Sequence, residues 1–286
     1  MASLKEIKAR ISSVKSTLKI TQAMKMVASA KLRKAQKMVG GLDAYKRALN
    51  DILSRLEGQM AASELMKKRD GQIAIIVFSS NTALCGSYNS NIFKALESRL
   101  AAISKEGGSA VVYPVGEKVS KMARKAGRNV CTDFVAAGDN LSYGDMAAMA
   151  QFFVDAFLSG RFARVELLYM HYHSAARQTI ENILWLPLKA SAATASDNSE
   201  PLDSDVIVEP SEQEVVEKLL PLAMRTDMYA TLLSSNASEN ACRMIAMQTA
   251  SDNAQDLLQQ LQLTYNKQRQ QDITEELTDI SNGKLA

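Results

Sequence analysis

Two long stretches of helical sequence stand at opposite ends of this chain, and they constrain its fold most strongly. Residues 4–57 and roughly 211–282 both have the residue content and apolar spacing of long helices, and about 150 residues of different character separate them. Each stretch carries an apolar stripe that its own sequence surroundings do not cover. Because such a stripe must be buried against another element, we expect the two ends to fold back on each other as a long antiparallel coiled coil.

The first stretch carries the repeat that a coiled coil requires. Lys25 interrupts its apolar row beside Met24, and Gly40 and Gly41 are expected to loosen the helix, at about 1 kcal/mol for each glycine. The row itself alternates in steps of four and three residues: Ile7, Ile11, Val14, Leu18, Thr21, Ala28, Leu32, Ala35, Val39, Leu42, Leu49, Leu53 and Leu56.

The middle of the chain has a different pattern, typical of an open α/β (Rossmann-like) sheet. Strands are predicted at 72–79, 110–115, 165–172 and 179–188, and helices at 89–104, 117–126 and 143–159. The last two strands should form a hairpin, and the polar segment 189–205 reads as a mobile loop. The final helix should start at the Pro210-Ser211-Glu212 signal, bend or break at Pro221, and stop at Asn282-Gly283. The predicted domains are therefore a coiled-coil helix at 1–57, a globular α/β domain at 70–205 and a second coiled-coil helix at 210–286.

Charge is unevenly distributed between the two ends. Residues 1–40 hold ten Lys and Arg against the single acid Glu6, whereas residues 225–286 hold five bases and eight acids. The first helix therefore favours an acidic partner, which could be a protein, a nucleic acid or a lipid surface.

Little in the sequence points to catalysis, a metal or a cofactor. Neither a dinucleotide-binding nor a phosphate-binding glycine motif occurs, and Cys85 lacks the flanks of a nucleophile. His171 and His173 could hold a metal, but without further ligands they read more simply as alternate residues on a strand. The three cysteines are too dispersed for a metal motif and read as reduced thiols. No apolar run is long enough to span a membrane, and the N-terminus has no signal-peptide core.

Two alternatives to a mechanical role remain open on these residues. A nucleic-acid-binding protein could use the basic helix around Lys31-Leu-Arg-Lys34, although no aromatic side chains interleave with it. Its binding would weaken steeply with salt. An enzyme in the α/β region would instead reveal itself by a ligand that raises the melting temperature.

Three longer segments carry a family resemblance. Residues Ile20–Ala35 (ITQAMKMVASAKLRKA) and Glu239–Asn253 (ENACRMIAMQTASDN), the latter continuing through Leu261–Gln270 to Leu277, resemble the terminal helices of the γ subunits of F-type ATP synthases. The turn Asn81–Asn89 (NTALCGSYN) is similar to one in the same family. The likeness covers nearly the whole chain in the right order, and it favours the bacterial type because the paired-cysteine insertion of chloroplast forms is absent.

The resemblance implies a non-catalytic role without a cofactor. It implies a central rotor shaft that couples the proton-driven rotation of a c-ring to the conformational cycle of catalytic β subunits. The implied partners are three α and three β subunits, the ε subunit and the membrane c-ring, with no nucleic acid. The implied location is peripheral, on the cytoplasmic face of the bacterial plasma membrane.

The resemblance also implies contact residues. Met24 and Lys25 match a position that touches an acidic lever of the β subunit, and Arg243, Gln270 and Thr274 match further polar β contacts. If Met24 lies beside Arg243, residue 1 faces about residue 266, and the helix from Gln268 onward is unpaired. An apolar collar would then cover Ile273, Leu277 and Ile280. Glu209 matches, more weakly, a region near the c-ring and ε.

Overall fold

The computed structural model describes residues 3–56, 63–138, 141–188, 209 and 211–283. The chain divides into two compact units: a helix-pair unit (Met1–Ala30 with Arg243–Ala286) and a sheet unit (Lys31–Cys242). Two long helices, α1 (Leu4–Arg55) and α6 (Glu212–Gly283), contribute to both units. Among the described helices, none is both long and apolar enough to cross a membrane.

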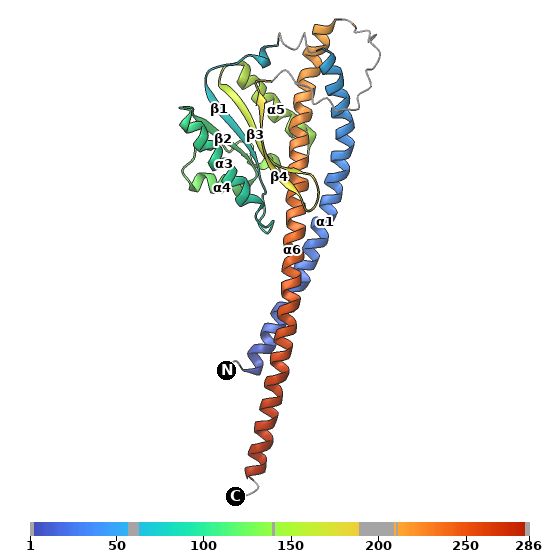
Figure 1. Ribbon diagram of the computed structural model, residues 1–286, viewed down its shortest axis with the longest axis vertical. Coiled ribbons are helices and arrows are strands. Elements are labelled where there is room, and N and C mark those ends of the chain that lie inside the picture. The colour runs from blue at the N-terminus through green and yellow to red at the C-terminus, as the bar shows by residue number, and fades with distance from the viewer. Residues whose placement is uncertain (1–2, 57–62, 139–140, 189–208, 210, 284–286) are drawn as a thin grey trace. The chain divides into compact units, whose positions relative to one another are not determined.

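The sheet unit is built on four strands in the order β2-β1-β3-β4 (Figure 1). They are β1 (Gln72–Phe78), β2 (Ala110–Val115), β3 (Phe162–Tyr172) and β4 (Gln178–Leu186). The strand β1 lies parallel to β2 and β3, and β4 returns antiparallel to β3. The predicted open α/β sheet and its closing hairpin are therefore confirmed, and the nearly continuous burial of β1 explains its unbroken apolar sequence.

Helices cover both faces of this sheet because successive side chains of β1 point to opposite sides. Ile73, Ile75 and Val77 pack with α3 (Tyr88–Lys105) and α4 (Glu117–Lys125). Ala74, Ile76 and Phe78 pack with α5 (Tyr143–Leu158), α6 and the last turns of α1. Two short 3₁₀ turns, η1 (Glu64–Met66) and η2 (Val135–Gly138), complete the unit. The predicted segment 189–205 lies outside the described residues, and the domain boundary predicted at 70–205 stays a prediction.

The helix α6 runs through Pro221 without interruption, so the predicted break there is wrong. Proline removes one backbone hydrogen bond, to the carbonyl of Glu217, but Glu217 is exposed and its carbonyl can bond to water. Leu220, Ala223 and Met224, which neighbour Pro221 in the sequence, are buried in the core that α6 shares with the sheet. This packing holds the helix together. The helix α1 likewise continues through Gly40 and Gly41.

The turn after β1 attaches the sheet to α6. The Ser80 hydroxyl donates to Glu239 Oε1 at 2.9 Å, and the Tyr88 hydroxyl lies 2.7 Å from Ser235 Oγ in a fully buried position. The Asn89 side chain accepts a hydrogen bond from the Ser80 amide and donates to Cys85 Sγ. The segment Asn81–Asn89, which the sequence singles out, therefore has a structural role in the sheet unit.

In the helix-pair unit, α1 and α6 pack along a seam, the row of side chains that each helix turns toward the other. The alignment of the two helices along this seam differs from the prediction. Thr21 and Ser251 are both buried, and their hydroxyls share a hydrogen bond of 2.8 Å. A pairing of Met24 with Arg243 would instead set Thr21 against Ala246, so the predicted alignment is wrong by five residues along α6. With the observed bond as reference, Ile7 lies opposite Tyr265 and Leu4 lies opposite Gln268.

Burial along α6 follows the same alignment in steps of four and three residues. Met247, Ser251, Ala254 and Leu258 are buried, and Leu261, Tyr265 and Gln268 are half-buried. Lys25 occupies a seam position opposite Met247 and is half-buried, since a lysine stem can pack while its ammonium group reaches water. Because α1 starts at Leu4, the paired seam ends near Gln268.

One buried ion pair joins a helix to the sheet. Arg99 of α3 contacts both carboxylate oxygens of Glu166 on β3, with a distance of 2.7 Å from Nε to Oε2, and Asn182 of β4 donates to the same carboxylate at 2.8 Å. Glu166 is 3% exposed. Burial raises the pKa of Glu166, but the hydrogen bonds from Arg99 and Asn182 and the charge of Arg99 outweigh it and leave the pKa lowered.

We expect Arg99→Met to lower the free energy of unfolding by about 3 kcal/mol, because Glu166 would keep a buried charge without its partner. Urea unfolding of the full chain, followed by the fluorescence of its single tryptophan, Trp185, measures this loss. Arg128→Met, which breaks a more exposed pair with Glu97, should cost much less.

The cost of Arg99→Met should also depend on pH. Since the folded-state pKa of Glu166 lies below its ordinary value of 4.5, the pair stabilises the fold above that value and ceases to do so as the pH falls through the lowered pKa. The difference in stability between the wild type and Arg99→Met should therefore shrink in acid. A difference that stays constant down to about pH 3 would contradict this assignment.

Candidate functional site

The outer face of α1 in the helix-pair unit presents large apolar side chains to solvent. Ile20 is 55% exposed, Met24 39%, Met26 67% and Val27 56%. They lie within two turns, while the seam positions Thr21 and Ala28 of the same turns are buried. Ile20, Met24 and Val27 are spaced by four and three residues and therefore lie on one face of the helix. Large apolar side chains gathered on one exposed face are typical of a surface that another protein covers.

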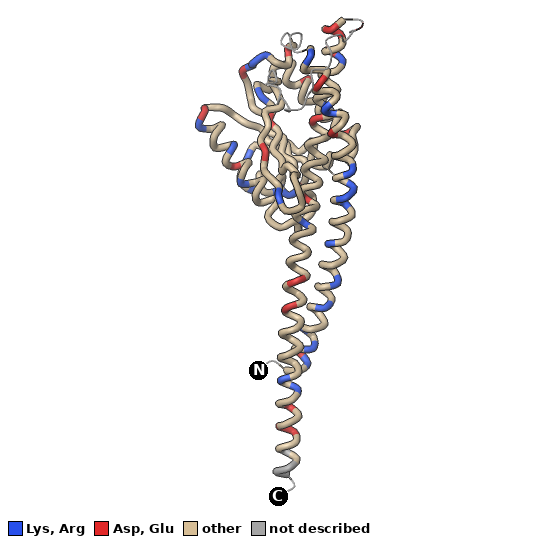
Figure 2. The backbone as a smooth tube through the Cα atoms, turned by 45° about the vertical axis from the view of Figure 1, so that its right-hand side comes forward, with Lys and Arg blue, Asp and Glu red and all other residues tan. Residues whose placement is uncertain are grey.

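Positive charge surrounds this apolar stretch (Figure 2). Ten Lys and Arg side chains lie between Lys5 and Lys37, and none of them forms an ion pair with the described part of the chain. The nearest interhelical ion pair in sequence is Lys46 with Asp227, which belongs to the sheet unit. The face of α1 therefore combines exposed apolar side chains with uncompensated positive charge, and this combination fits an acidic protein surface.

The end of α6 presents a second exposed apolar row. Ile273 is 48% exposed, Leu277 62% and Ile280 61%. Their spacing of four and three residues puts them on one face of the helix. The seam partner α1 has already ended, because the last paired position of α6 is Gln268. Within the described residues, this row has no element of the same unit to pack against.

The residues predicted as contacts fall on separate parts of the chain. Met24 and Lys25 lie on α1, and Arg243 lies on α6 in the same unit, although the seam sets Lys25 opposite Met247 rather than Arg243. Gln270 and Thr274 lie on the exposed end of α6, about 40 Å along the helix from Arg243. Glu209 is exposed and precedes α6. The predicted contacts therefore form at least two surfaces.

Two members of the α1 surface, Ile20 and Val27, were not singled out from sequence. Both lie one turn from Met24, but they fall between the seam positions, and an apolar residue between seam positions carries no signal of its own. The clustering of large apolar residues at non-seam positions within one basic stretch could have indicated the surface.

Tyr88 and Cys131 have raised pKa values and lie in or against the packed cores of the sheet unit. Burial raises the pKa of Tyr88 well above its ordinary value, as does the nearby charge of Glu239. Burial also raises the pKa of Cys131. Cys85 is buried beneath the turn after β1 and accepts a hydrogen bond from Asn89. These groups are turned toward the interior, whereas the surfaces on α1 and α6 are exposed and suited to binding.

Comparison with known proteins agrees with this geometry. The family model described as ATP synthase matches residues 3–286. Among curated relatives, the ATP synthase gamma chain of Phocaeicola vulgatus is 44% identical over 290 residues, covering all of both chains. That of Parabacteroides distasonis is 41% identical over 286 residues, covering 99% of this chain and 98% of the relative.

Solved structures share the fold. The rotor of the Euglena gracilis mitochondrial ATP synthase matches with a TM-score of 0.64 at 19% identity, covering 94% of this chain and 98% of that chain. The central stalk and c-ring structure of the Tetrahymena thermophila mitochondrial ATP synthase matches with a TM-score of 0.58 at 24% identity, covering 81% of this chain and 99% of that chain. The full-length relatives and the family model together establish that this chain belongs to the ATP synthase gamma chain family.

Proposed function

We propose that this chain is the central rotor subunit of a proton-translocating ATP synthase. In this role it couples the rotation of a membrane c-ring to the conformational cycle of three catalytic β subunits. The chain itself is non-catalytic, and ATP chemistry takes place in the ring of α and β subunits. Its family membership and the fold that it shares with rotor structures support this assignment.

The exposed apolar row at the end of α6 carries the proposal most directly. Ile273, Leu277 and Ile280 are about half to two-thirds exposed, beyond the last residue that α1 can cover. Burying a side chain of this size contributes about 1.5–3 kcal/mol, so three exposed in a row represent a substantial drive to associate. A collar of apolar residues from the α and β subunits would cover them, and Gln270 and Thr274 would meet polar groups at its rim.

The basic apolar face of α1 fits the acidic lever of a β subunit. Met24 would contact the lever, while the half-buried Lys25 and the neighbouring bases would supply attraction. Lysines on an exposed helix form weak, hydrated contacts that exchange readily between partners. Such contacts suit a surface that must meet three β subunits in turn. Arg243 would form a further polar contact.

The sheet unit would provide the attachment to the ε subunit and the c-ring, with Glu209 near that contact. The subunit would then lie peripherally on the cytoplasmic face of a bacterial plasma membrane, where the c-ring is embedded. The absence of a membrane-spanning helix among the described residues is compatible with this placement.

Co-expression with the α and β subunits of the same organism tests the proposal. We expect a stable assembly of three α, three β and one copy of this chain on a sizing column, with ATPase activity that requires this chain. Replacing Ile273, Leu277 and Ile280 together with serine should reduce the recovery of the assembly, because the apolar contact with the collar is lost.

The matched control is Leu158→Ser, which replaces an apolar side chain of similar exposure at the end of α5. It should leave recovery unchanged, and circular dichroism should show equal helix content in all variants. If the chain elutes alone and the ATPase activity of the α and β subunits is the same with and without it, the rotor assignment fails.

Met24→Lys should impair coupling more than folding, because it adds positive charge where an apolar side chain faces the lever. The ratio of protons pumped to ATP hydrolysed, measured in membrane vesicles, should fall while thermal stability stays the same. Gln22→Lys adds the same charge on the opposite face of α1, since residues two apart on a helix point away from each other, and should have less effect. Equal coupling in wild type and Met24→Lys would refute the contact.

A further inference from the structure

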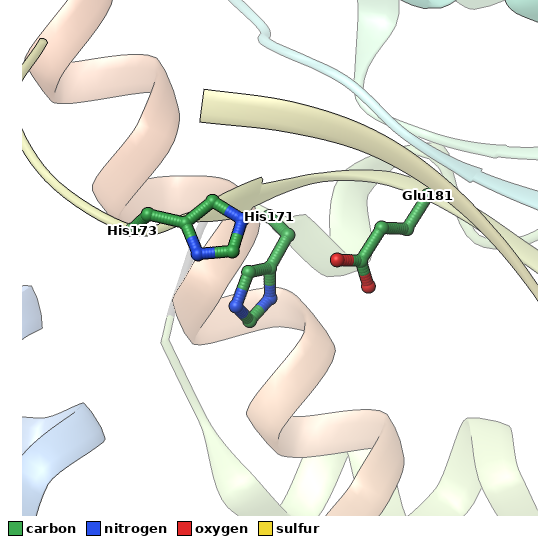
Figure 3. A group of neighbouring side chains, drawn as sticks. All are labelled: His171, His173 and Glu181. Atoms are coloured by element: carbon green, nitrogen blue, oxygen red, sulfur yellow. The ribbon is translucent and has the colours of Figure 1, made fainter. Parts of the chain in front are cut away.

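The end of the β3–β4 hairpin brings together three side chains that can bind a metal ion (Figure 3). His171 is in β3, and His173 comes two residues later, directly after the last residue of the strand. Both side chains therefore point to the same side. Glu181 is on β4, where it pairs with Tyr169 of β3. Tyr169 is two residues before His171 and points to the same side of the sheet. Figure 3 shows the His171 ring between the His173 ring and the Glu181 carboxylate.

The distances are close to those of a metal site. One donor atom from each of the three residues lies within 4.8 Å of the others, and the two imidazole centroids are 4.6 Å apart. Ligands bound at about 2.0–2.2 Å around a tetrahedral ion are roughly 3.4 Å from one another. Small rotations of side chains close this gap. His173 is exposed and the other two residues are half-buried, so an ion can enter and the side chains can adjust.

Neighbouring hydroxyls hold these ligands in the way that outer-shell groups hold metal ligands. The Tyr169 hydroxyl donates to Glu181 Oε2 at 2.9 Å, which fixes the carboxylate and leaves its other oxygen available. The hydroxyls of Ser234 and Tyr169 lie 3.3 Å and 3.4 Å from His171 Nδ1 and orient this ring. Thr179 Oγ1 lies 2.8 Å from His173 Nε2 and orients the His173 ring.

We propose that His171, His173 and Glu181 form a binding site for a divalent transition metal, with Zn²⁺ as the preferred ion. Two imidazoles and one carboxylate are a donor set that zinc accepts, with a fourth position left for water. A cavity of about 240 Å³ adjoins the group, and His171, Tyr169 and Ser234 line it. It provides room for that water. The ion would connect β3 to β4, and the hydroxyl of Ser234 would connect the site to α6 in the sheet unit.

Calorimetric titration of the full chain with zinc chloride tests the proposal. We expect one Zn²⁺ bound per chain, and an affinity that falls at least about tenfold in His173→Gln and in Glu181→Gln. Both changes are conservative, and His173 is exposed, so folding should be unaffected. Zn²⁺ should also raise the melting temperature of the wild type more than that of either variant, since binding to the native state stabilises it. Titration with Co²⁺ should give the intense visible bands of a four-coordinate ion.

Two controls make the outcome specific. The chain has only the two histidines, so the competing zinc ligands are its three cysteines. A variant with Cys85, Cys131 and Cys242 replaced by serine should bind as the wild type does, and so should Glu217→Gln, which removes an exposed carboxylate of α6. Unchanged zinc affinity in His173→Gln, loss only in the cysteine variant, or no binding to the wild type would each overturn the proposal.

Discussion

The seam between α1 and α6 is the constraint on which the functional surfaces depend. The buried hydrogen bond between Thr21 and Ser251 fixes which residues face each other, and the four-and-three spacing carries that alignment to both sides. Since α1 starts at Leu4, the alignment also determines where α6 loses its partner. The exposure of Ile273, Leu277 and Ile280 is thus a consequence of helix alignment and helix length, and the same alignment turns Met24 outward.

A single helix, α6, serves two different purposes along its length. Between Met224 and Ala241 it is buried on most sides, because the sheet, α5 and the end of α1 all pack there. From Met247 onward only the seam positions are buried, and after Gln268 every described side chain but one, Asp272, is exposed. The turn after β1 anchors the buried part through Glu239 and Ser235. A rotor subunit requires both properties: a firm attachment to its own core and a surface that remains free for partners.

The sequence was sufficient to locate the helices and strands, but it was insufficient to align α1 with α6. The sequence located all four strands, although β3 begins at Phe162 rather than near 165, because Phe162 and Ala163 are also buried. The alignment of two heptad stripes could not be derived, since several alignments bury an apolar row equally well; the Thr21–Ser251 bond decided it. Glu181 was missed as a companion of His171 and His173 for a similar reason, because the pairing of β3 with β4 is known only from the hairpin itself.

Hydrogen exchange measured residue by residue on α6, in the chain alone and in its assembly with α and β subunits, is the most direct test of the seam and of its purpose. In the chain alone, we expect amides at 247–265 to exchange slowly and those at 273–283 to exchange fast, because only the former are paired with α1. In the assembly, 273–283 should become protected. Equal protection of both segments in the chain alone would contradict the alignment, and fast exchange of 273–283 in the assembly would contradict the proposed collar.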